Sequence, residues 1–146
     1  MKVYEASLRY KTVGEIRELP LEDSQIAGEY IRRATEEQPE FDPTVECVSV
    51  VLLNQKHYPQ GLVTVSKGSA TSSIVHPREV FKPAILAGSS AIILTHNHPS
   101  GLPEPSVADH AITKKIREAS EQLDMRMLDH IIIGDYDYSF AESGTL

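Results

Sequence analysis

Hydrophobic and polar side chains recur along the first third of the chain with two different periods, which predict both strands and a helix. Apolar and polar residues alternate over residues 3–10, which is the pattern of a half-buried strand. Apolar residues then recur at helical spacing from an N-cap at Asp23 or Ser24 until Pro39 ends the pattern. Residues 45–53 are apolar and rich in β-branched side chains, so they predict a central strand.

The rest of the chain continues this mixture of strands and helices. Residues 58–61 are a turn signal, which predicts a hairpin whose returning strand follows at residues 62–65. A helix is predicted to open at Pro77 and to end at Gly88, with Pro83 as a point where it can kink. The remaining predicted elements are a buried strand at residues 91–94, a polar segment at 95–101, a helix at 106–123, a strand at 128–133 and a last strand at 138–141. This mixture predicts an α/β (α+β) fold.

Length and composition favour one globular unit, because the chain has 146 residues of which 40% are hydrophobic. We therefore expect a single domain over residues 1–146, with a strand and a helix in residues 1–40 and the chemistry in residues 41–146. A chain of this length can fold without a disulfide or a structural metal, so any metal it binds is expected to be functional. The length also excludes a (β/α)8 barrel, which needs at least about 200 residues.

The cysteine content and the apolar stretches bear on the compartment. Cys47 is the single cysteine, so an internal disulfide is excluded and a reducing compartment fits, of which the cytoplasm is the simplest. The first residues lead into no apolar signal segment, and the longest apolar stretches are far too short to span a membrane. We expect a cytoplasmic protein that is not embedded in a membrane.

Two histidines and an aspartate form the strongest chemical pattern. His96 and His98 are two residues apart at a strand end, so their side chains leave the backbone on the same face. Asp109 follows near the start of a predicted helix, where its carboxylate can turn back toward the strand end. Three protein ligands that leave the fourth position to water are the arrangement that makes zinc catalytic, so these residues predict a zinc site.

Each part of this pattern also has an explanation without a metal. Ser106 and Asp109 have the spacing of a capping box, which is common at helix starts. The segment from His96 to His98, taken alone, is also compatible with a polar loop. The conjunction favours a metal site, because a polar loop gains nothing from two histidines on one face followed by a helix that opens with an aspartate.

The same residues resemble a known family. The chain contains the pattern His96-x-His98, seven intervening residues, then Ser106-x-x-Asp109. This pattern resembles the signature of the JAB/MPN (JAMM) metalloprotease domain. The run HNHPSG at residues 96–101 resembles the bacterial RadC branch, and the likeness extends to residues 74–81 and 128–134. RadC proteins usually carry an N-terminal helix-hairpin-helix region associated with DNA, whereas this chain resembles the shorter members that lack it.

The resemblance implies a JAB/MPN-like (cytidine-deaminase-like) domain with a mixed β-sheet flanked by helices. It implies one zinc ion per chain, held by His96, His98 and Asp109, with a bound water as the nucleophile toward a peptide or protein substrate. It assigns Glu46, on an early strand, as the base that takes the proton from water and passes it to the leaving amine. Ser106 would donate its hydroxyl to the oxyanion that develops.

Alternatives stay open for several residues. Glu46 by itself is an ordinary solvated carboxylate at a strand end, and Cys47 in an apolar strand is more typical of packing than of a thiol ligand. His76 is a candidate helix cap, and His110 points elsewhere on its helix. His130 begins a buried strand, where it is either a hydrogen-bonding partner of a zinc ligand or a satisfied core histidine.

The leading functional hypothesis is a zinc-dependent hydrolase, specifically a metalloprotease or isopeptidase. A first alternative is a metal-dependent hydrolase of another bond type, although those folds usually need more ligands. A second alternative is a non-catalytic scaffold or DNA-repair-associated module that has kept the fold. Inactive relatives are expected to lose ligands, whereas all of them are present in this sequence.

The charge balance generates a prediction about nucleic acids. Fourteen Lys and Arg residues against 21 Asp and Glu residues give a net charge of −7, the wrong sign for a domain that neutralises phosphates. We expect duplex DNA to bind weakly at physiological salt, with a Kd above about 1 µM in a fluorescence anisotropy titration. Submicromolar binding to arbitrary duplexes that weakens steeply with added salt would contradict this expectation.

Overall fold

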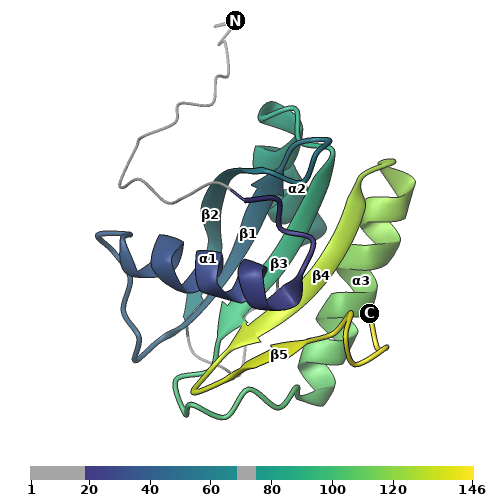
Figure 1. Ribbon diagram of the computed structural model, residues 1–146. Coiled ribbons are helices and arrows are strands. Elements are labelled where there is room, and N and C mark those ends of the chain that lie inside the picture. The colour runs from purple at the N-terminus through teal and green to yellow at the C-terminus, as the bar shows by residue number, and fades with distance from the viewer. Residues whose placement is uncertain (1–18, 69–74) are drawn as a thin grey trace, which may run out of the picture.

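The computed structural model describes residues 19–68 and 75–146, which form a sheet with helices on both faces (Figure 1). In chain order, the elements are α1 (Ser24–Glu36), β1 (Glu46–Leu53), β2 (Pro59–Gly68), α2 (Pro77–Leu86), β3 (Ala91–Asn97), α3 (Val107–Gln122), β4 (Arg126–Ile133) and β5 (Asp137–Ser139). The strand predicted at residues 3–10 lies outside the described residues. None of the helices in the two described ranges is long and apolar enough to cross a membrane.

Five strands form one mixed sheet in the order β2-β1-β3-β4-β5. β1 pairs antiparallel with both β2 and β3, β4 lies parallel to β3, and the short β5 is antiparallel to β4. Two parallel strands need a crossover connection, and α3 provides it between β3 and β4. The mixed sheet and its flanking helices confirm the predicted fold class.

Alternation along the strands divides the core into two layers, one on each face of the sheet. Even-numbered residues of β1 and β3 pack beneath α2 and α3, whereas odd-numbered residues pack beneath α1, which crosses the near face in Figure 1. The first layer includes Val48, Val50, Leu52, Phe81, Ala84, Leu94 and Ile116, and the second includes Ala27, Ile31, Val51, Leu53 and Ile93. Burial on both faces explains why these strands are continuous apolar runs.

The hairpin between β1 and β2 turns earlier than the sequence predicts. The turn expected at residues 58–61 is wrong, because Pro59 already belongs to β2. The Asn54 side chain instead accepts hydrogen bonds from the backbone N–H groups of Lys56 and Tyr58, and His57 adopts a φ of 60°. An asparagine that bonds to its own following backbone is sufficient to form this turn without the Pro-Gly signal.

β3 extends three residues beyond its predicted end. Thr95, His96 and Asn97 all pair with β4, and the first two also pair with β1. The polar segment expected at residues 95–101 therefore begins inside the sheet, because neighbouring strands on both sides satisfy its backbone. His96 is consequently held by the sheet, and His98 is the first residue after Asn97, where the strand ends.

The first two helices begin at the residues that the sequence predicts as their starts. Asp23 caps α1, where its carboxylate accepts hydrogen bonds from the N–H groups of Gln25 and Ile26. Pro77 opens α2 as predicted, and the helix continues through Pro83. His76 holds the N-cap position of α2 as the sequence suggested, although its side chain makes no capping hydrogen bond with the described residues.

Leu94 offers a test of the packing in the first layer, where it is 0% exposed on the central strand. The change Leu94→Ala should lower the free energy of unfolding by about 2–5 kcal/mol, because it removes buried methyl groups and leaves a cavity. Urea denaturation followed by circular dichroism measures this loss. The matched control Leu86→Ala, at a residue 45% exposed on α2, should change stability by no more than about 0.5 kcal/mol. Equal losses in the two variants would contradict the packing described.

Candidate metal centre

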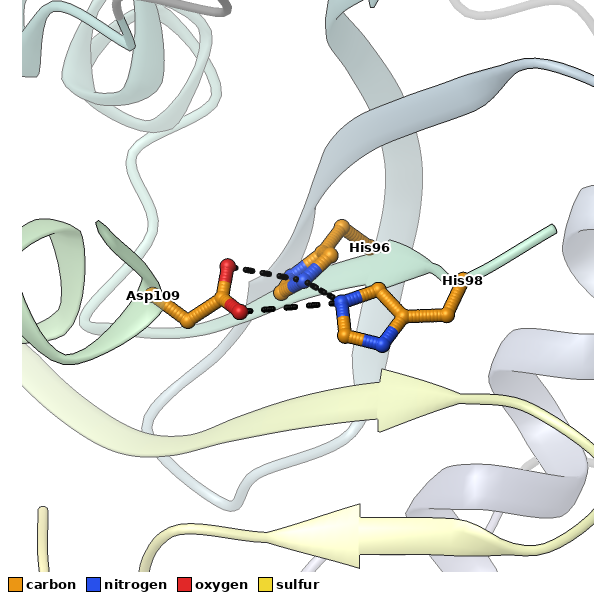
Figure 2. Close-up of side chains that lie close together, drawn as sticks. All are labelled: His96, His98 and Asp109. Carbon is orange, nitrogen blue, oxygen red and sulfur yellow. Dashed lines mark hydrogen bonds and ion pairs between the residues drawn. The ribbon is translucent and has the colours of Figure 1, made fainter. Parts of the chain in front are cut away.

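Three side chains that carry ligand atoms meet at one end of the sheet (Figure 2). His96 lies near the end of β3, His98 follows the strand, and Asp109 lies in the first turn of α3. Their ligand atoms are all within 4.8 Å of one another, so the three residues could hold a metal ion. The structure therefore brings together the three residues that the sequence proposes as ligands.

The ligand atoms face one another at short range. Nε2 of His96 lies 3.0 Å from Nε2 of His98 and 3.1 Å from Oδ1 of Asp109. Nε2 of His98 lies 3.6 Å from Oδ2 of Asp109. His96 and Asp109 are only 4% and 5% exposed, whereas His98 is half-buried, so solvent can reach the group from the side of His98.

The loop after β3 orients the ring of His98. Nδ1 of His98 lies 2.7 Å from the carbonyl oxygen of Leu102, which can only accept a hydrogen bond. Nδ1 therefore donates its hydrogen to this carbonyl, and in the neutral tautomer with this hydrogen Nε2 faces the other two ligands with its lone pair. Gly101 permits this turn, since its φ is 84° and its N–H donates to the carbonyl of His98.

The capping box and the metal site use the same carboxylate, so the two explanations of Ser106 and Asp109 are compatible. Oδ2 of Asp109 accepts hydrogen bonds from the N–H of Ser106 at 2.7 Å and from its hydroxyl at 2.6 Å. The Asp109 N–H in turn lies 3.2 Å from Oγ of Ser106. The cap fixes the carboxylate and leaves Oδ1 directed at His96.

Asp109 is held in its ionised form. Burial alone would raise the pKa of its carboxyl group, but the contact with the His96 ring and the hydrogen bonds from Ser106 outweigh burial and hold the pKa well below its ordinary value. The start of α3 adds to this effect, because the positive end of a helix dipole stabilises a carboxylate in the first turn. A charged carboxylate beside two imidazole nitrogens is a suitable donor set for a divalent transition metal.

Glu46 lies outside the group of ligand atoms. It is the half-buried first residue of β1, and it is not among the clustered ligand atoms of the described residues. Val48 pairs with His96 across the two strands, so Glu46 is on the same face of the sheet, two residues further toward the end where His98 lies. The catalytic roles assigned to Glu46 and Ser106 stay predictions.

Asn97 holds the backbone on both sides of Glu46, which the sequence did not predict. Its Oδ1 accepts a hydrogen bond from the N–H of Cys47 at 2.8 Å, and its Nδ2 donates to the carbonyl of Val45 at 3.0 Å. The side chain thus continues the pairing of β1 and β3 beyond their backbone register. The sequence signal that could have indicated this role is the position of Asn97 between the two histidines. At a strand end, a polar side chain in that position faces away from the histidines and needs partners of its own.

His130 is a buried core histidine whose ring also contacts that of His96, so both explanations proposed from the sequence stay open. It is 1% exposed on β4, its ring stacks on Phe140 with centroids 4.7 Å apart, and its Nε2 lies 2.9 Å from Nδ1 of His96. Burial lowers the pKa of His130 well below its ordinary value, which favours the neutral ring. Cys47 is buried in β1 and His110 is exposed on α3, and neither belongs to the clustered ligand group.

Comparison with known proteins gives one family. A family profile described as "RadC-like JAB domain" matches residues 21–145. The UPF0758 protein of Trichlorobacter lovleyi is 52% identical over 106 residues, which are 72% of this chain and 46% of that protein. The UPF0758 protein of Alkaliphilus metalliredigens is 55% identical over 93 residues, 64% of this chain and 40% of that protein.

The extent of these matches limits what they convey. The UPF0758 protein of Pelobacter propionicus, which is 53% identical over 98 residues, is matched over 66% of this chain and 43% of its own length. The chain thus spans less than half the length of these curated relatives. The names of these relatives state no activity.

The geometry predicts that metal binding needs the three ligands together. Wild-type protein should bind about one zinc ion per chain, and the double variant His96→Ala/His98→Ala should bind none, because a single carboxylate leaves an incomplete shell. Zinc content is measured by elemental analysis after dialysis, with His110→Ala as a control that should keep its zinc. Full zinc occupancy in the double variant would contradict the assignment.

Chelation should leave the circular dichroism spectrum unchanged, since the two apolar layers lie elsewhere.

Proposed function

This chain belongs to the RadC-like JAB domain family, and we propose that it is a zinc-dependent hydrolase that cleaves peptide or isopeptide bonds with an activated water. The observation that carries the proposal is the meeting of Nε2 of His96, Nε2 of His98 and the Asp109 carboxylate at the end of the sheet. Two nitrogens and one oxygen suit zinc, and three protein ligands leave a position for water, as in catalytic sites.

The chain's own residues provide the proton transfers and the orientation. When bound, a zinc ion supplies a Lewis acid that lowers the pKa of a water toward about 7. Glu46 takes the proton of that water and delivers it to the leaving amine, from a backbone position that Asn97 holds on both sides. Asp109 and His96 are buried and fixed, so they keep the reacting geometry while substrate enters from the side of His98.

Ser106 would stabilise the oxyanion by turning its hydroxyl toward the substrate. In the free site that hydroxyl donates to Oδ2 of Asp109. The carboxylate can release it without losing its place, because the backbone N–H of Ser106 also donates to Oδ2, at 2.7 Å. A hydroxyl that strengthens its hydrogen bond only when charge develops on the substrate lowers the free energy of the transition state more than that of the bound substrate. It therefore lowers the barrier of the reaction.

The surroundings of the site support a polypeptide substrate. Ser106 is exposed at the start of α3, and two residues close to it in sequence expose apolar side chains. Leu102, whose backbone carbonyl binds His98, is 60% exposed, and Val107, which follows Ser106, is 88% exposed. Apolar side chains exposed beside an accessible site favour contact with the side chains of a peptide. We infer a peptide or protein substrate that approaches over this loop.

Glu46→Gln separates catalysis from metal binding, because the amide keeps the size of the side chain but cannot act as a base. Zinc content should stay at the wild-type level while turnover falls by about 10²–10⁴-fold, the usual contribution of a general acid and base. Turnover is measured on a library of internally quenched peptides and lysine-branched isopeptides, with mass spectrometry to locate the bond cleaved. Glu118→Gln, at an exposed residue of α3, is the control and should be unchanged.

Two outcomes would count against the proposal. Unchanged turnover in Glu46→Gln would remove Glu46 as the base. Zinc-loaded wild-type protein that cleaves no member of the library would contradict the hydrolase and favour the non-catalytic scaffold.

A further inference from the structure

Four residues form a closed circuit of contacts that links two of the metal ligands through the core. Nδ1 of His96 lies 2.9 Å from Nε2 of His130, and Nδ1 of His130 lies 2.6 Å from Oγ1 of Thr113. Oγ1 of Thr113 lies 2.7 Å from the backbone carbonyl of Asp109, whose carboxylate faces His96 at 3.1 Å. The circuit joins β3, β4 and α3, and all four residues are buried.

When the two histidine rings are neutral, only one arrangement of hydrogens makes each of the three contacts from His96 to the Asp109 carbonyl a hydrogen bond. The carbonyl of Asp109 can only accept, so the single hydroxyl hydrogen of Thr113 must point to it. Oγ1 of Thr113 must then accept from His130, which places the ring hydrogen of His130 on Nδ1. In a neutral His130 ring this leaves Nε2 able only to accept, so His96 must carry its hydrogen on Nδ1.

We propose that Thr113 and His130 are positioning residues that fix the tautomer of His96, so that its Nε2 presents a lone pair to the metal before the metal arrives. This inference rests on the proposed metal function. His98 obtains the same tautomer by a separate route, through the carbonyl of Leu102. Both rings therefore direct unprotonated Nε2 atoms at one point, and an ion that enters has no hydrogen to displace from either neutral ring.

The alternative tautomer shows what the circuit prevents. With its hydrogen on Nε2, His96 would donate to Oδ1 of Asp109, which lies 3.1 Å away. That hydrogen bond would occupy both a nitrogen ligand and the carboxylate, and it would compete directly with metal. When the hydrogen is held on Nδ1, this competing state is removed. Hydrogen bonds to the nitrogen that does not bind the metal raise the metal affinity of a histidine in this way.

The tautomers can be observed in zinc-free protein, independently of any activity. Long-range ¹H–¹⁵N correlation spectra of ¹⁵N-histidine-labelled protein distinguish a hydrogen on Nδ1 from one on Nε2. We expect the Nδ1–H form for His130 in the wild-type protein and its conversion to Nε2–H in Thr113→Val, because the valine leaves a buried Nδ1–H without an acceptor. The Nε2–H form of His130 in zinc-free wild-type protein would overturn the proposal.

Metal affinity gives the second measurement. Competition with a chromophoric chelator should show zinc binding about 10–100-fold weaker in Thr113→Val, and Thr113→Ser should restore it by returning the hydroxyl. The matched control is Thr95→Val, at another buried threonine, whose hydroxyl has no hydrogen-bond partner among the described residues and whose loss should leave affinity unchanged. Thermal unfolding of the zinc-free variants checks that each is folded.

The outcomes separate this inference from the function on which it rests. Wild-type affinity in Thr113→Val, or an equal loss in Thr95→Val, would overturn the role of the circuit while leaving the zinc site intact. Wild-type protein that binds no zinc would overturn the proposed function, whereas the spectra of the zinc-free protein would still decide the tautomers of His96 and His130.

Discussion

The candidate site depends on three ligand side chains that face one another at a largely buried end of the sheet. Nε2 of His96 lies 3.0 Å from Nε2 of His98 and 3.1 Å from Oδ1 of Asp109. With the proposed tautomers these atoms present lone pairs to one another, which repel unless a cation lies among them. The neighbouring contacts maintain this arrangement: Ser106 holds the carboxylate, and Leu102 and His130 each bind the far nitrogen of a ring. A site that is costly when empty is strongly stabilised by the ion it fits.

The fold supplies the group from its most rigid parts. The parallel pair β3 and β4 requires α3 as a crossover, which places the start of that helix beside the end of β3. The end of the strand contributes the two histidines, and the start of the helix contributes a carboxylate in a position that also caps it. The same face of the sheet continues to Glu46, so ligands and proposed base share one surface with their backbones fixed.

The sequence predicts those features that arise from local periodicity. The central strands, the three helices and the grouping of His96, His98 and Asp109 follow from apolar spacing, helix signals and the two-residue period of a strand. The end of β3 did not follow, because polar residues enter a strand only when its neighbours satisfy them, which is a tertiary property. The contacts of Asn97 and Thr113 likewise join segments 17 to 52 residues apart, and no local pattern marks such partners.

Anomalous X-ray diffraction tests most directly whether His96, His98 and Asp109 bind one metal ion. Crystals of the full chain, grown with zinc and measured on both sides of the zinc absorption edge, should show one strong anomalous peak within about 2.0–2.2 Å of both Nε2 atoms and of an Asp109 carboxylate oxygen. Zinc-soaked crystals with no anomalous peak among His96, His98 and Asp109 would contradict the claim.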